Sequence, residues 1–371
     1  MLVQINNPLQ ATEIFSTILF FAICFSAYRR EIKEWLPASL STELKGLAIL
    51  MIVFSHIGYF LVSDTRFLWP LSTLAGVGVN LFLFLSGYGL AVSQIKRNLS
   101  IGQFYSRRLL KLFIPLWLLL AIVLPLDFFI LKVNYSWPVI GRAIFGIFIH
   151  ANLYQDFNSP LWYLTFIIGY YLLFPLVFCQ KRPWLTALIL AAAGYLLIQV
   201  NPQLLGNVIY LYRVHIMAFP LGVGVAWLVS KIPSSVILLG WFRGRRAIFY
   251  YLLIAAAVAL FVFANINASI GGNYHQEELM SLVAIGALLI IFILKKIKFK
   301  LFYWLGVYSY EIYLWHWPLM YRYDIFYRFL PAWLATALYL VLFVGLGWLM
   351  SKIAGMINDL LARPAVSRTE K

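Results

Sequence analysis

A lysine and a histidine in one apolar segment are the residues whose types and spacing point most clearly to chemistry. Lys45 is followed by His56, and the ten residues between them are apolar or small. On an α-helix eleven positions make almost three turns and about 16 Å of rise, so the two side chains share one face. A neutral imidazole at that depth can act as a general base toward a hydroxyl group. A buried histidine that only bonds to a neighbouring helix is the alternative, and the residues alone leave both open.

Two more ionisable residues, Glu311 and His316, lie in an aromatic segment that ends in Trp317-Pro318. Such a segment can form the aromatic belt of a membrane interface. It can also present polar groups and aromatic rings, among them Tyr310, to a sugar. Because ionisable side chains are costly at bilayer depth, both residues are candidates for a functional role.

Two weaker features complete the set of candidate residues. Arg108 and Lys111 are neighbours on a helix, and such a pair can hold phosphates through charge-assisted hydrogen bonds. Charges that merely flank a membrane span would look the same. Asn80 and Ser86 lie in the glycine-rich stretch 76–89, whose small residues favour close helix packing. We expect neither a metal ion nor a permanently bound cofactor.

The composition indicates that membrane helices must position these side chains. Of 371 residues, 63% are hydrophobic and only 11% are charged, whereas soluble domains average about 25% charged residues. The apolar runs are long enough to cross a hydrocarbon core of about 30 Å. Cys24 and Cys179 both fall in such runs, so they form no disulfide scaffold.

Hydropathy and helix breakers predict an all-α, polytopic transmembrane helix bundle with about eleven spans. The short apolar stretch 138–150 is expected to be interfacial or re-entrant. We expect residues 1–40 to hold an N-terminal span and a cytoplasmic linker, 41–355 the main transmembrane domain, and 356–371 a cytoplasmic tail whose last five residues are frayed. The predicted spans lie near 11–27, 45–62, 73–94, 109–130, 160–178, 184–200, 211–229, 247–266, 280–294, 301–321 and 332–352.

The net charge of +16 has a topological explanation. With the N-terminus outside and the C-terminus in the cytoplasm, 23 of the 29 basic residues fall in inner loops. This is the positive-inside pattern of membrane proteins. The charge therefore indicates orientation and contact with membrane lipids, and we expect no nucleic-acid partner.

Together and in this order, the motifs resemble the acyltransferase 3 family of integral membrane acyltransferases, over roughly residues 40–350. The family pattern of a basic residue, ten residues and a histidine is matched by Lys45 and His56. Four further stretches resemble family motifs: Gly78 to Tyr88; Arg108 to Pro115; Leu161, Trp162, Tyr163 and Leu164; and Ser309, Tyr310, Tyr313, Leu314, His316 and Pro318.

The sequence departs from the family at some positions. Asn80 stands where many members have Asp, and Lys111 replaces an arginine, which removes a bidentate donor. Pro115 also falls one residue later than usual. The family core has ten spans, so residues 11–27 look like an added N-terminal span. We expect the stand-alone form, without the fused hydrolase-like domain of many members.

The resemblance implies an O-acyltransferase, usually an O-acetyltransferase, in the bacterial plasma membrane. Its donor would be cytoplasmic acyl-CoA, normally acetyl-CoA, and its acceptor a hydroxyl of an extracytoplasmic or lipid-linked glycan. His56 would be the catalytic base. The donor would be held by Lys45, Arg108 and Lys111, and the substrate-binding residues would include Asn80, Ser86, Trp162, Tyr310, Glu311 and His316.

Three other interpretations stay open. One is an unrelated membrane-bound O-acyltransferase, although the order of the five motifs argues against it. Another is a transporter or flippase of lipid-linked sugars in which His56, Glu311 and His316 relay protons. The third is a non-catalytic scaffold of a polysaccharide-export complex.

Overall fold

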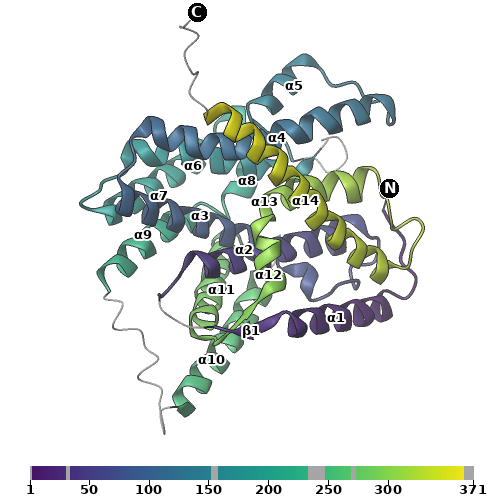
Figure 1. Cartoon of the computed structure of the whole chain (residues 1–371), viewed down its shortest axis with the longest axis horizontal. Helices are drawn as coiled ribbons and strands as arrows, with labels where there is room; N and C mark the ends of the chain where they lie inside the picture. The colour runs from purple at the N-terminus through teal and green to yellow at the C-terminus, as the bar shows by residue number, and fades with distance from the viewer. Residues whose placement is uncertain (1, 31–33, 152–157, 233–246, 269–272, 363–371) are drawn as a thin grey trace, which may run out of the picture.

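The computed structural model describes residues 2–30, 34–151, 158–232, 247–268 and 273–362 (Figure 1). In this part of the chain nine helices are long and apolar enough to cross a membrane, which confirms the predicted all-α membrane bundle. They are α1 (Pro8–Phe25), α2 (Ala38–Ser55, continued by a π-helical turn), α3 (Ala75–Arg97), α4 (Ile101–Phe129), α6 (Trp162–Val177, preceded by a 3-10 turn), α7 (Pro183–Val200), α10 (Ala247–Asn267), α11 (Tyr274–Leu294) and α14 (Ala332–Ala362).

The predicted span 211–229 is not a single long helix. It is divided into α8 (Val208–Tyr212) and the 14-residue α9 (Ala218–Lys231). Pro220 explains where α9 begins, because proline lacks an N–H group and is tolerated only in the first turn of a helix. The turn between the two helices holds His215.

The predicted span 301–321 is interrupted as well. It consists of α12 (Lys300–Val307), α13 (Ser309–Trp317) and the π-helical turn η8 (Pro318–Arg322). The Ser309 hydroxyl donates to the Gly306 carbonyl at 3.0 Å, close to the break at Tyr308. Pro318 then ends the regular α-helix, since its ring opposes continuation of the ladder.

Two predictions for shorter segments can also be compared with the structure. The stretch 138–150 contains only the eight-residue α5 (Trp137–Ile144), so the helix there is too short to cross a membrane. Helix α14 continues to Ala362, so the first residues of the predicted cytoplasmic tail 356–371 are helical. The rest of that tail, like the basic residues of 233–246, lies outside the described residues.

Paired glycines bring the central helices into close contact. A Cβ atom on Gly46 of α2 would lie 1.8 Å from the Phe302 carbonyl oxygen of α12, and one on Gly306 would lie 1.8 Å from the Thr42 carbonyl oxygen. Gly87 of α3 and Gly222 of α9 form a second reciprocal pair. The glycine-rich stretch 76–89 thus packs as predicted at this point, because only a residue without a side chain fits.

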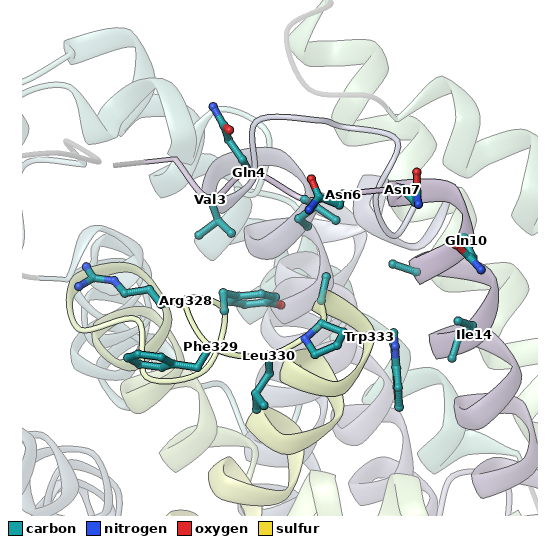
Figure 2. A pocket seen from close by; sticks show the side chains of 15 residues that line it. Val3, Gln4, Asn6, Asn7, Gln10, Ile14, Arg328, Phe329, Leu330 and Trp333 are labelled. Atoms are coloured by element: carbon teal, nitrogen blue, oxygen red, sulfur yellow. The ribbon is translucent and has the colours of Figure 1, made fainter.

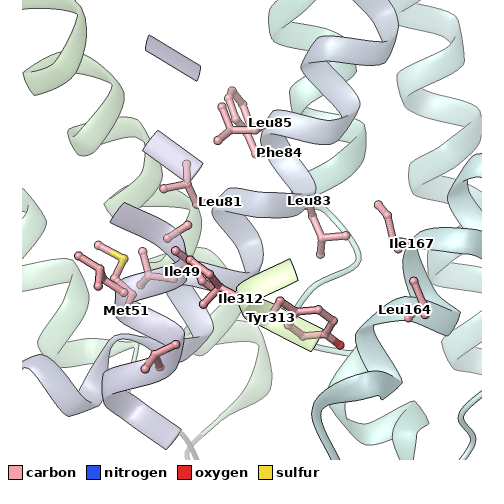
Figure 3. Close-up of a cluster of buried hydrophobic side chains, with 14 of the residues drawn as sticks. Ile49, Met51, Leu81, Leu83, Phe84, Leu85, Leu164, Ile167, Ile312 and Tyr313 are labelled. Carbon is pink, nitrogen blue, oxygen red and sulfur yellow. The ribbon is translucent and has the colours of Figure 1, made fainter. Parts of the chain in front are cut away.

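The apolar core lies where α2, α3, α6 and α13 converge. Figure 3 shows Ile49, Leu81, Leu164 and Ile312, one from each of these helices, within a single cluster of buried side chains. These helices carry most of the candidate site residues. Positioning of the site is therefore tied to packing of the core.

A short two-stranded sheet joins the N-terminal segment to the bundle. Strand β1 (Ala27–Arg29) pairs antiparallel with β2 (Ile297–Phe299). The buried Glu43 carboxylate accepts from the Lys295 ammonium and, at 2.8 Å, from the Phe299 amide. The rest of the element order is completed by short helical turns at His56–Leu61 (η1), Leu71–Thr73 (η2), Ser159–Leu161 (η3) and Gln203–Leu205 (η4).

Candidate active site

The two histidines singled out in the sequence are in direct contact, although 260 residues separate them. His56 Nδ1 and His316 Nε2 are 2.7 Å apart, and the ring planes differ by only 10°. His56 follows the last residue of α2, whereas His316 is the penultimate residue of α13. Packing of these two helices therefore creates a histidine pair that neither segment contains alone.

The hydrogen bonds of His316 assign the protons of the pair. Its Nδ1 lies 2.7 Å from the Tyr313 carbonyl oxygen, which can only accept, so Nδ1 carries the proton. In the neutral ring Nε2 is then an acceptor, and His56 Nδ1 must donate to it. This assignment leaves the Nε2 atom of His56 with a lone pair, and no hydrogen-bond partner for it is found among the described residues.

Each histidine lies at the start of an irregular turn or shortly before one. His56 is the first residue of the π-helical turn η1 (His56–Leu61), and η8 begins two residues after His316. Isolated π-helical turns are often found at functional sites. The two turns contact each other, so both chain segments leave the histidine pair in the same direction.

A cavity of about 150 Å³ connects His56 with Lys45. His316 is fully buried and absent from its wall, whereas His56 retains some accessibility and lines it. The pair therefore consists of one ring at the cavity and one ring behind it. The wall residues are Lys45, Ile52, His56, Val79, Phe82, Ser86, Leu112, Pro160, Trp162, Tyr163, Ile167, Tyr171, Ser309, Tyr310 and Tyr313.

Hydroxyl groups dominate the polar part of the cavity wall. Ser86 lies close enough to Tyr163 and Tyr171 to act on both phenol groups. The Tyr310 hydroxyl donates to the Leu112 carbonyl at 2.7 Å, and the Tyr313 hydroxyl donates to the Pro160 carbonyl. Two tyrosines are thus fixed by backbone acceptors, while Ser86 and its two partners form a group of donors within the cavity.

Three cations gather at the end of the cavity away from His56, which we call the basic end. Lys45 lines the cavity, and the charges of Arg108 and Lys111 lie close enough to act on it electrostatically. Arg108 is half-buried and Lys111 is exposed on α4. Like charges repel one another here, and an anionic ligand would offset this repulsion.

Asn80, a predicted substrate-binding residue, does not line the cavity. Its amide nitrogen donates to the Val214 carbonyl at 3.0 Å and to the Ser281 hydroxyl at 2.8 Å, and its oxygen lies 2.8 Å from His215 Nδ1. His215 in turn stacks on Trp162 at the cavity wall, with ring centroids 5.4 Å apart. Asn80 therefore fixes a third histidine.

His215 is the residue that our sequence reasoning missed. It falls inside the predicted span 211–229, so the rule that selected His56, an ionisable group at membrane depth, applies to it equally. Its side chain is only 4% exposed. The contact with Asn80 joins α3 to the turn before α9, and no spacing in the sequence indicates that contact.

Glu311 takes no part in the hydrogen bonds of the histidine pair. Its carboxylate accepts from the Ser351 hydroxyl of α14 at 2.8 Å and is absent from the cavity wall. Among the predicted residues the cavity thus brings together Lys45, His56, Ser86, Trp162 and Tyr310, with Arg108 and Lys111 beside Lys45. Asn80 and His316 contact the wall from behind, through His215 and His56, whereas Glu311 bonds to α14.

Comparison with known proteins identifies the domain. Residues 44–352 match the family described as acyltransferase domain, acyltransferase 3. The chain is 25% identical over 320 residues to "Peptidoglycan O-acetyltransferase OatA" of Listeria monocytogenes serovar 1/2a, an alignment that covers 75% of this chain. The chain spans about half of that relative, 48% of its length. No solved structure matches the chain.

The matched region contains the histidine pair, the cavity and the three cations. It also agrees with the extent of the resemblance inferred from the motifs. The chain belongs to the acyltransferase 3 family of membrane acyltransferases.

Proposed function

We propose that this membrane acyltransferase moves an acetyl group from cytoplasmic acetyl-CoA to a hydroxyl group of an extracytoplasmic or lipid-linked glycan. The observation that carries the proposal is the free lone pair assigned to His56 Nε2 in a cavity that also reaches Lys45. The printed name of the relative, a peptidoglycan O-acetyltransferase, supports acetyl transfer to a glycan.

His56 acts as the general base of the transfer. Its Nε2 accepts the proton of the acceptor hydroxyl while the hydroxyl oxygen attacks the thioester carbonyl carbon. The C–S bond then breaks, and the same proton passes to the departing thiolate. Throughout the reaction His316 Nε2 accepts the hydrogen bond that His56 Nδ1 donates. This bond holds the imidazole of His56 in the productive tautomer and stabilises the imidazolium that forms.

The oxyanion of the tetrahedral intermediate needs donors beside the reacting carbonyl. Ser86 and its partners Tyr163 and Tyr171 are the hydroxyl donors of the cavity that are not bonded to backbone carbonyls in the described structure. We assign this role to the group rather than to one hydroxyl, since all three line the same cavity close to one another.

The basic end receives the donor. Lys45, Arg108 and Lys111 hold the phosphates of acetyl-CoA, and the narrow cavity accepts its slender thioester arm. A volume of about 150 Å³ is below the usual 300–1,000 Å³ of pockets for whole small molecules. The nucleotide therefore stays outside the cavity, and the arm spans the distance between Lys45 and His56.

The orientation follows from the donor. With the basic end in the cytoplasm, the N-terminus lies outside and the C-terminus inside, in the bacterial plasma membrane. This arrangement agrees with the positive-inside distribution of the basic residues. Residues 41–355 then form the transferase domain, preceded by the added span within residues 1–40.

The test uses purified protein in nanodiscs with radiolabelled acetyl-CoA and neutral oligosaccharides. We expect labelled oligosaccharide from wild type, and none above background from His56→Ala. His275→Ala is the matched control, because His275 is exposed at the start of α11. Equal transfer by His56→Ala and wild type, or no consumption of acetyl-CoA by wild type, would refute the proposal.

The donor site has a separate prediction. Lys111→Ala removes one exposed cation from the basic end and should raise KM for acetyl-CoA about tenfold, with kcat little changed. Lys181→Ala serves as control, since Lys181 is an exposed lysine that lies outside the cation cluster. An unchanged KM for Lys111→Ala would show that Lys111 does not bind the donor and only flanks a membrane span.

A further inference from the structure

A second pocket, of about 560 Å³, lies between the N-terminal segment and the loop that precedes α14. Its volume is within the range of ordinary small-molecule sites. Figure 2 shows Val3, Gln4, Asn6, Asn7 and Gln10 along one side and Arg328, Phe329, Leu330 and Trp333 on the other. The N-terminal side thus supplies the amide side chains, and the opposite side supplies the aromatic ones.

Four primary amides give the pocket its chemistry. Gln4, Asn6, Asn7 and Gln10 are all exposed, and none has a side-chain hydrogen bond to another group in the described parts of the chain. Each amide offers two donors and one acceptor oxygen, which matches the hydroxyl and acetamido groups of sugars. Trp333 and Phe329 add ring faces on which the C–H faces of a pyranose can pack.

Charge argues against a phosphate ligand in this pocket. Arg328 is its one cationic side chain, and its Nε lies 3.3 Å from the Asp324 carboxylate. The guanidinium charge is therefore largely balanced. A site for an anionic lipid headgroup would instead gather several unpaired cations, so the lining favours a neutral saccharide.

The pocket lies at the end of α2 opposite the basic end, and its first wall is attached to the turn that begins at His56. The Val3 amide donates to the Leu61 carbonyl at 2.8 Å, and the Ser63 amide donates to the Val3 carbonyl at 2.9 Å. These bonds fix the N-terminal segment to the last residue of η1 and the residues that follow it.

The second wall is attached to the turn that follows His316. The Tyr339 hydroxyl donates to the Leu319 carbonyl of η8 at 3.1 Å and accepts from the Ile325 amide at 2.8 Å. Both walls are therefore attached to turns that start at or near the histidine pair, and both lie on the side of the pair away from Lys45. A saccharide held here lies on the acceptor side of the histidines.

We infer that this pocket binds a neutral saccharide unit of the acceptor glycan, next to the unit whose hydroxyl reacts at His56. The inference rests on the proposed function and deepens it. Residues 3–14 lie outside the family match, which begins at residue 44. The added N-terminal segment therefore supplies half of an acceptor subsite and selects glycans that are longer than a single sugar.

The test measures binding and transfer separately, with full-length protein in nanodiscs. The probes are fluorophore-labelled chitotetraose and cellotetraose, with the corresponding monosaccharides for comparison. We expect Trp333→Ala and the double variant Asn6→Ala, Gln10→Ala to weaken tetrasaccharide binding about tenfold. Trp348→Ala, an exposed tryptophan further along α14, and Gln203→Ala are the matched controls and should bind as wild type does.

Measuring binding and transfer separately distinguishes failure of the proposed function from failure of the subsite inference. His56→Ala should lose transfer and still bind the tetrasaccharide. If wild type binds the sugars in a pocket-dependent manner but transfers nothing, the proposed function fails and the subsite stands. If wild type binds neither tetrasaccharide, or if the pocket variants bind and acetylate them as wild type does, the subsite inference is overturned.

Discussion

At the scale of single residues, the account depends on one hydrogen-bond assignment. The Tyr313 carbonyl fixes the proton on His316 Nδ1, and that proton makes His316 Nε2 the acceptor for His56. A chain of this kind, from carbonyl to histidine to histidine, orients the base without placing a charge in the membrane. In the proposed mechanism His316 is accordingly a positioning residue, and His56 is the residue that meets substrate.

The first prediction concerns His316. His316→Ala removes the acceptor of the His56 Nδ1 proton, so the imidazole can adopt either tautomer and gains no stabilisation when protonated. By analogy with other histidine-orienting groups, kcat should fall about 10²- to 10⁴-fold while KM for acetyl-CoA stays the same.

A merely structural role for His316 would give a different result. It would lower the amount of folded protein and leave kcat per folded molecule near that of wild type. His316→Gln keeps a polar side chain at the position and should stay folded, as judged by thermal unfolding in detergent, yet remain slow. A normal kcat for this variant would contradict the positioning role.

At the scale of elements, glycine pairs set how closely the site helices approach. Gly46 follows Lys45 directly and touches the backbone of α12, so a displacement of α2 at this contact would also displace Lys45. The breaks at Tyr308 and at Pro318 then direct α13 across α2, where His316 meets His56.

The second prediction follows from this contact. Gly46→Ala places a methyl group where the Phe302 carbonyl lies, and should cost about 1–3 kcal/mol of stability. It should also raise KM for acetyl-CoA, because Lys45 shifts with the helix. Gly89→Ala is the control, since nothing lies within 4 Å of the corresponding Cβ position.

Thermal unfolding in detergent, together with acetyl-CoA kinetics, checks this pair of variants. A Gly46→Ala protein as stable and as active as Gly89→Ala would show that the close approach of α2 and α12 is dispensable.

Much of the fold at this scale could be predicted from sequence, because apolar runs of membrane length leave the backbone few alternatives to helix. The interruptions of 211–229 and 301–321 are harder, since they depend on where Pro220 and Pro318 fall within a helix. The contact of His56 with His316 cannot be derived from spacing at all. It arises from packing between segments 260 residues apart, and before the structure the two residues were grouped only by the family resemblance and by the proton-relay interpretation.

At the scale of the whole molecule, the two ends of the described structure differ in their chemistry. The three cations lie at one end of α2, and the amide-lined pocket lies at the other, with the histidine pair between them. A single cavity that joins a charged mouth to a base suits a donor and an acceptor that arrive from opposite sides of a membrane.

The third prediction tests that orientation. In a Cys24→Ser, Cys179→Ser background, a cysteine at Gln276 should react with an impermeant maleimide added to intact cells. A cysteine at Lys296, at the other end of α11, should react only after the membrane is opened. Both positions are exposed, so accessibility within the protein does not limit either reaction, and the reverse labelling pattern would invert the topology.

The most direct test of the account is sided transfer in sealed proteoliposomes. Radiolabelled acetyl-CoA is added outside and a neutral oligosaccharide is trapped inside, so only molecules with the basic end outward can react. The account predicts labelled oligosaccharide in the lumen for wild type and His275→Ala, and none for His56→Ala. Transfer that occurs only when donor and acceptor share one compartment, or that persists in His56→Ala, would contradict it.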